Sequence, residues 1–154
     1  MKFPITLFIL LFSLFSKAQD LSKLQPLDAE LTAVNYPFPV QFKELKNQGQ
    51  QLKMAFMDVQ PAKPNGKTIV LLHGKNFNGY YFEQTAKELQ KEGFRVLMPD
   101  QIGFGKSSKP KQYQFSFQQL AENTKSILND LKIQNFIVLG HSMGGMLATK
   151  MAVM

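Results

Sequence analysis

Cysteine is absent from the 154 residues, which excludes disulfide bonds, a thiolate nucleophile and a lipid-modified cysteine. If the protein is exported, it folds without covalent cross-links. Histidine is scarce as well, because His73 and His141 are the only two in the sequence. The sequence contains no metal-ligand cluster and no nucleotide-binding motif, so we expect neither a metal nor another cofactor.

The sequence also lacks an apolar run long enough to span a membrane. A span needs about 20 predominantly apolar residues, whereas the run 3–15 is shorter and is interrupted by Pro4. Lys2 precedes this run and small residues follow it up to Ala18, which is the order of a secretory signal peptide. We therefore expect residues 1–18 to be removed near Ala18, and the product to be exported to the periplasm or beyond without a stable membrane span.

Charge of one sign is not concentrated anywhere in the chain. The formal net charge is +7, but the lysines are scattered, which indicates a solvated basic surface and no nucleic-acid partner. With 44% hydrophobic and 12% aromatic residues, the composition is that of a globular protein of one domain.

Strand-like and helix-like patterns alternate after a lead-in segment, residues 19–39, that contains three prolines and shows no periodicity. The alternation predicts an α/β domain over 40–154, with a mostly parallel sheet and helices on both faces. The expected strands are 40–45, 51–60, 67–72, 94–100 and 135–140, and the expected helices are 80–92, 116–131 and the segment after 142.

The most informative motif is G-x-S-x-G at residues 140–144. The motif alone arises by chance, but here it follows an apolar run, which we interpret as a buried strand, and it opens a helix. This is the context of a nucleophile elbow, in which a serine sits on a strained turn. Gly140 and Gly144 leave room for that turn, His141 points away from the serine, and Ser142 is the candidate nucleophile.

An oxyanion site is expected beside Ser142. The backbone N–H of Met143 lies at a helix N-terminus, where amides have no helical partner and carry partial positive charge. A second donor should come from the loop after the strand 67–72, where Gly74 allows the backbone to turn toward the site. We predict the N–H of Lys75 as this donor, with Asn76 as the alternative.

The pair HG and GHSMGG, with MPDQIGFGKSSKP between them, resembles the serine-nucleophile branch of the α/β-hydrolase fold family over residues 36–154. The resemblance implies that His73 shapes the oxyanion loop and that Asp100 has a structural role. Dehalogenases and epoxide hydrolases, which carry aspartate at the elbow, are disfavoured by Ser142. Esterases, lipases, aminopeptidases, carbon–carbon bond hydrolases and acyltransferases remain open.

In that family the catalytic acid and histidine follow the nucleophile in the chain, and neither histidine here does so. We therefore expect the N-terminal part of an exported serine hydrolase, with the fold truncated after the elbow helix and little activity as it stands. Two alternatives remain open: a non-catalytic binding module or decayed enzyme, and an acyltransferase in full-length form. The partner we expect is a small-molecule acyl substrate, whose identity the sequence leaves open along with the oligomeric state.

Overall fold

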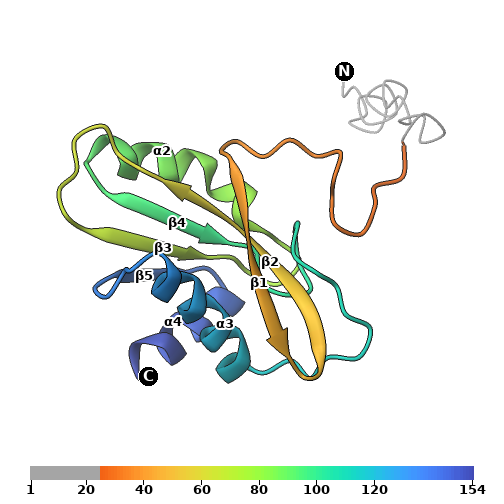
Figure 1. The fold of residues 1–154 in the computed structure, drawn as a ribbon. Helices are drawn as coiled ribbons and strands as arrows, with labels where there is room; N and C mark the ends of the chain where they lie inside the picture. The colour runs from red at the N-terminus through yellow and green to blue at the C-terminus, as the bar shows by residue number, and fades with distance from the viewer. Residues whose placement is uncertain (1–24) are drawn as a thin grey trace, which may run out of the picture.

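The computed structural model describes residues 25–154. The predicted signal peptide and the first part of the lead-in lie outside these residues. Within the described part of the chain, no helix is both long and apolar enough to cross a membrane. A five-stranded sheet in the order β1-β2-β4-β3-β5 forms the centre of the domain (Figure 1). The strands are β1 (Val40–Asn47), β2 (Gln50–Val59), β3 (Thr68–Leu72), β4 (Arg95–Pro99) and β5 (Ile137–Gly140).

The sheet begins with an antiparallel hairpin, β1 and β2, that is longer than the sequence predicts. The ladder runs from the pair Val40–Met57 to the pair Asn47–Gln50. Only Gln48 and Gly49 remain in the turn, and both have positive φ angles, 47° and 72°. A two-residue turn of this hand matches the twist of paired strands, so the ladder continues through residues that we assigned to a loop.

The sheet is mixed, and β2 is the strand that runs against its neighbours. β2 pairs antiparallel with both β1 and β4, whereas β3 pairs parallel with β4 and β5. The three parallel strands are connected through helices, because consecutive parallel strands need a crossover connection. Since parallel strands share one direction, β3 and β5 end at the same edge of the sheet, where the predicted site residues follow them.

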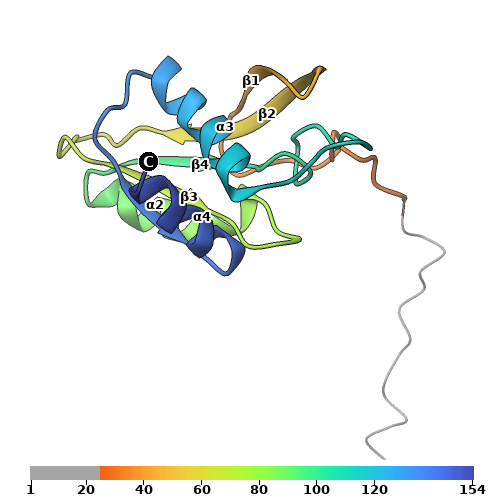
Figure 2. The same ribbon diagram turned by 90° about the horizontal axis from the view of Figure 1, so that it is seen from below.

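Helices cover both faces of the sheet, as predicted. Figure 2 shows α2 (Glu83–Lys91) and α3 (Phe117–Asp130) on opposite sides of it. Alternate residues of β3 face different layers, because successive strand side chains point to opposite faces. Ile69 and Leu71 join the core under α2, and Val70 and Leu72 join the core under α3 and α4 (Met143–Ala152).

The helix starts follow the capping signals in the sequence. Ser116 precedes α3, and its hydroxyl accepts a hydrogen bond from the Gln119 amide, as predicted. The segment expected as a helix over 80–92 instead begins with the 3-10 turn η2 (Gly79–Phe82) before α2. Asn78 caps this turn through its side chain, which accepts from the Tyr80 amide.

β5 is the edge strand of the described sheet, and it is not the buried strand we predicted. Ile137 and Leu139 are 49% and 46% exposed, while the alternate residue Val138 packs on the core. On α4, Leu147 and Met151 are buried and Ala152 is exposed. The described residues thus cover only one face of β5.

The centre of the sheet should dominate stability. Leu97 in β4 has no exposed surface, so Leu97→Ala should lower the free energy of unfolding by about 2–5 kcal/mol through lost burial and a cavity. Leu27, which is 64% exposed, is the matched control, and Leu27→Ala should change it by no more than about 0.5 kcal/mol. Urea denaturation of both variants checks this prediction, and equal losses would contradict it.

Candidate active site

Ser142 occupies a sharp turn between the end of β5 and the first residue of α4. Its backbone angles are φ 54° and ψ −117°, a conformation that L-residues rarely adopt and that costs on the order of 1–3 kcal/mol. The residue is exposed, and its side chain makes no capping hydrogen bond to α4. The turn therefore presents the hydroxyl to solvent at the sheet edge where β3 also ends.

The two glycines of the motif are required by close backbone contacts. A Cβ atom at Gly140 would lie 2.0 Å from the carbonyl oxygen of Gly144, and one at Gly144 would lie 2.0 Å from the carbonyl oxygen of Leu72. The structure thus confirms the predicted reason for both glycines. It also shows that Gly144 lets the start of α4 press directly against the end of β3.

The two amides predicted as oxyanion donors lie at one cavity. Lys75 and Met143 both line a cavity of about 400 Å³, and within the described chain neither backbone N–H makes a hydrogen bond. The next two amides of α4 differ, since Gly144 donates to the His141 carbonyl and Gly145 to the Ser142 carbonyl. Asn76, the alternative donor, is not among the residues that line this cavity.

His73 is fully buried and holds the loop after β3, where we predict the second oxyanion donor. Its Nε2 atom accepts the backbone N–H of Gln101 at 2.9 Å. The proton is therefore assigned to Nδ1, which lies 2.8 Å from the Gly74 carbonyl oxygen and donates to it. Burial lowers the pKa of His73 below its ordinary value. Both ring nitrogens are occupied, so this histidine does not serve Ser142 as a base.

His141 faces the aromatic residues that follow the oxyanion loop. Its ring packs edge-on against Phe77 and Tyr81, with centroid distances of 5.8 Å to each. A Cβ at Gly74 would lie only 2.9 Å from His141 Nδ1, so the imidazole also limits the space beside the loop. Like His73, His141 therefore packs against the loop after β3, next to the elbow.

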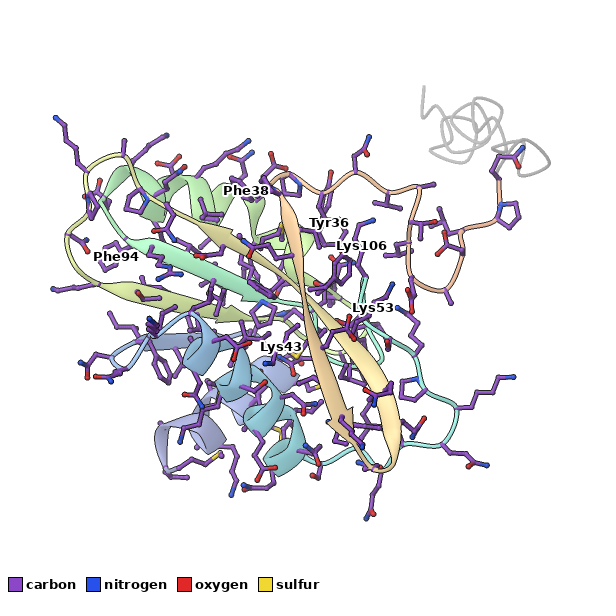
Figure 3. All side chains as sticks on the ribbon, in the orientation of Figure 1. Tyr36, Phe38, Lys43, Lys53, Phe94 and Lys106 are labelled. Atoms are coloured by element: carbon purple, nitrogen blue, oxygen red, sulfur yellow. The ribbon has the colours of Figure 1, made fainter. Side chains whose placement is uncertain are left out.

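Asp100 is buried and accepts three hydrogen bonds, which agrees with the structural role predicted for it. The donors are the Gly79 amide at 2.6 Å, the Lys106 amide at 2.7 Å and the Tyr36 hydroxyl at 2.7 Å. Burial and the nearby carboxylate raise the pKa of Tyr36. Figure 3 shows Tyr36 beside Lys106, whose ammonium nitrogen is 5.1 Å from the ring centroid.

The contact between Tyr36 and Asp100 could not be read from the sequence. The two residues are 64 positions apart, and Tyr36 stands in a segment without periodicity. Among residues 25–154, no three histidine, aspartate or glutamate side chains are arranged to hold a metal ion.

Comparison with known proteins identifies the fold. The family described as alpha/beta hydrolase fold matches residues 67–154. The chain belongs to this alpha/beta hydrolase family. Over 121 residues it is 31% identical to a haloalkane dehalogenase of Mycobacterium marinum, covering 77% of this chain and 40% of that protein.

Solved structures agree with this assignment to the alpha/beta hydrolase family. A probable hydrolytic enzyme from Pseudomonas aeruginosa PAO1 superposes with a TM-score of 0.81 at 50% identity, covering 82% of this chain and 41% of that one. An esterase from Exiguobacterium antarcticum gives a TM-score of 0.62 at 28% identity, covering 73% and 40%. The chain thus spans about two fifths of the length of these relatives.

The elbow glycines provide a matched pair of variants. Gly144→Ala should lower the free energy of unfolding by more than about 3 kcal/mol, because its methyl group meets the Leu72 carbonyl and α4 must move. Gly145→Ala meets nothing closer than 3.6 Å and should leave stability unchanged or raise it by up to about 1 kcal/mol. Thermal or urea unfolding distinguishes them, and similar stabilities for the two variants would contradict the observed packing.

The buried His73 should make the fold sensitive to acid. The pKa of His73 is lowered in the folded protein. As the pH falls below about 6.5, His73 is therefore protonated in the unfolded chain before it is protonated in the folded one, and the free energy of unfolding decreases. The slope should approach about 1.4 kcal/mol per pH unit. Urea titrations between about pH 5.5 and 7.5 should show this slope for the parent and for His141→Gln, and a shallower one for His73→Gln. Equal slopes in all three proteins would contradict the conclusion that the buried His73 causes the acid sensitivity.

Proposed function

We propose that this chain carries the nucleophile and the oxyanion site of an exported serine hydrolase that cleaves carboxylic esters or related carbonyl compounds. The observation that carries the proposal is the strained, exposed Ser142, together with Met143 and Lys75, which line one cavity and whose backbone N–H groups make no hydrogen bond within the described chain. Backbone strain persists where the surrounding structure imposes it, and it is concentrated at functional sites.

The proposed reaction has two steps. The Ser142 oxygen forms a bond to the substrate carbonyl carbon while its proton passes to a base, and the Met143 and Lys75 amides stabilise the negative charge on the carbonyl oxygen. The bond between the carbonyl carbon and the alcohol oxygen then breaks, and the alcohol takes the proton from the base. The product of this first step is an acyl-enzyme. Water attacks this ester in the second step and releases the acid and free Ser142.

The base must come from elsewhere than the two histidines of residues 25–154. His73 uses both ring nitrogens, and His141 packs against Phe77 and Tyr81. Asp100 is saturated by three donors. We propose that a histidine and an acid outside the described residues complete the site in the whole protein.

Serine at the elbow favours acyl chemistry over the reaction named for the dehalogenase relative. The chain is similar to a haloalkane dehalogenase of Mycobacterium marinum and to an esterase of Exiguobacterium antarcticum. Displacement of halide from a saturated carbon by Ser142 would leave an ether on the enzyme, which water does not cleave, whereas attack on a carbonyl leaves an ester that water can hydrolyse. A carbonyl substrate uses both the hydroxyl and the amides.

The test uses the whole protein, expressed from the gene that encodes it, with p-nitrophenyl esters as substrates. We expect Ser142-dependent hydrolysis and, by mass spectrometry, one acyl group on the peptide that contains Ser142. Ser142→Ala should abolish both, with a loss of at least about 10³-fold in kcat, as expected for removal of a nucleophile. Ser126→Ala, at a half-buried serine of α3 whose hydroxyl donates to the Asn123 carbonyl, should retain both.

Three outcomes would contradict the proposal. They are undiminished ester hydrolysis by Ser142→Ala, an acyl group on another residue, and release of halide from 1-chlorobutane at a rate above that of ester cleavage. Transfer of the acyl group to added methanol in preference to water would keep Ser142 as nucleophile and change the reaction from hydrolysis to acyl transfer.

A further inference from the structure

The cavity of about 400 Å³ beside the two amides has an apolar wall. Lys75 and Met143 line it. The other lining residues come from the loop after β4 and from the start of α3. The large side chains among them are Phe104, Phe115, Phe117 and Leu120.

The lining selects for neutral, apolar groups. A cavity of this volume lies within the range of small-molecule sites, and among its described lining residues Lys75 alone is charged. Lys75 is exposed, and a long exposed lysine keeps its ammonium group in water. Burial of each methylene group against such a wall is worth about a four-fold gain in binding.

Phe115 stands where the wall meets solvent. It is 52% exposed, and Tyr113 packs edge-on against it with a centroid distance of 4.9 Å. Gly103 makes this position possible, since its φ of 93° is rare for other residues and a Cβ there would lie 3.1 Å from the Phe115 ring. The ring therefore lies directly on the glycine loop, the segment after β4 that contains Gly103 and Gly105, and its removal opens the cavity without emptying the core.

We infer that this cavity is the acyl site, that it takes neutral apolar acyl chains, and that Phe115 limits the length of the chain. The inference rests on the proposed function, because the cavity is the acyl site only if the carbonyl carbon is attacked by Ser142. The sheet places the cavity against Met143, the residue after Ser142. An acyl chain in the cavity would thus extend from the carbonyl away from the elbow and toward Phe115.

The test measures kcat/KM for p-nitrophenyl esters from acetate to dodecanoate. For the parent, kcat/KM should rise about four-fold for each added methylene until the cavity is filled. Phe115→Ala should move the optimum to longer chains, and Phe115→Trp should move it to shorter ones. Phe42 in β1 is 47% exposed and lies outside this cavity, so Phe42→Ala is the matched control and should keep the parent optimum.

Binding provides a readout that does not need turnover. Octanoate should bind to Ser142→Ala in isothermal titration calorimetry, and addition of Phe115→Ala should change its affinity while addition of Phe42→Ala should not. Absence of octanoate binding would overturn the inference. So would a preference for the charged p-nitrophenyl hydrogen succinate over the butyrate ester.

The two proposals fail in different ways. Hydrolysis that no longer depends on Ser142 would overturn the proposed function. Ser142-dependent hydrolysis with the same chain-length optimum in Phe115→Ala and Phe42→Ala would overturn the acyl-site assignment alone.

Discussion

The site depends on the close approach of α4 to the end of β3. Gly144 lies so near the Leu72 carbonyl that no side chain fits between them, and Gly140 is equally tight against Gly144. Because α4 is held there, only a short connection joins β5 to α4. Ser142 lies in this connection and takes a strained conformation. The exposure of its hydroxyl and the free Met143 amide follow from the same constraint, because Ser142 lies in the turn and Met143 is the first residue of the helix, where amides have no intrahelical partner.

Two buried polar side chains hold the neighbouring loops against this elbow. His73 links the Gly74 carbonyl to the Gln101 amide, and Asp100 gathers donors from the lead-in, η2 and the glycine loop. Their buried polar atoms are satisfied by backbone groups and by the Tyr36 hydroxyl, so each loop is fixed in one position. The oxyanion loop and the cavity wall are thus positioned by residues that do not touch the proposed substrate.

β5 forms an exposed edge of the described sheet. β5 leaves Ile137 and Leu139 half exposed, and the chain spans about two fifths of its relatives. Apolar edge strands are normally paired or covered. This exposed edge strand leads directly into the elbow that carries Ser142.

Local signals in the sequence determined the element order, the Ser116 cap and the turn at the elbow, because each depends on residues that are neighbours in the chain. The α/β class followed from the alternation of strand and helix. Only the tertiary structure decided the antiparallel pairing of β2 with β4, the exposure of β5 and the contact between Tyr36 and Asp100. It also decided that Phe115 lies on Gly103 beside the amides. These features join segments far apart in the chain, and packing between such segments leaves no periodic or spacing signal in either one.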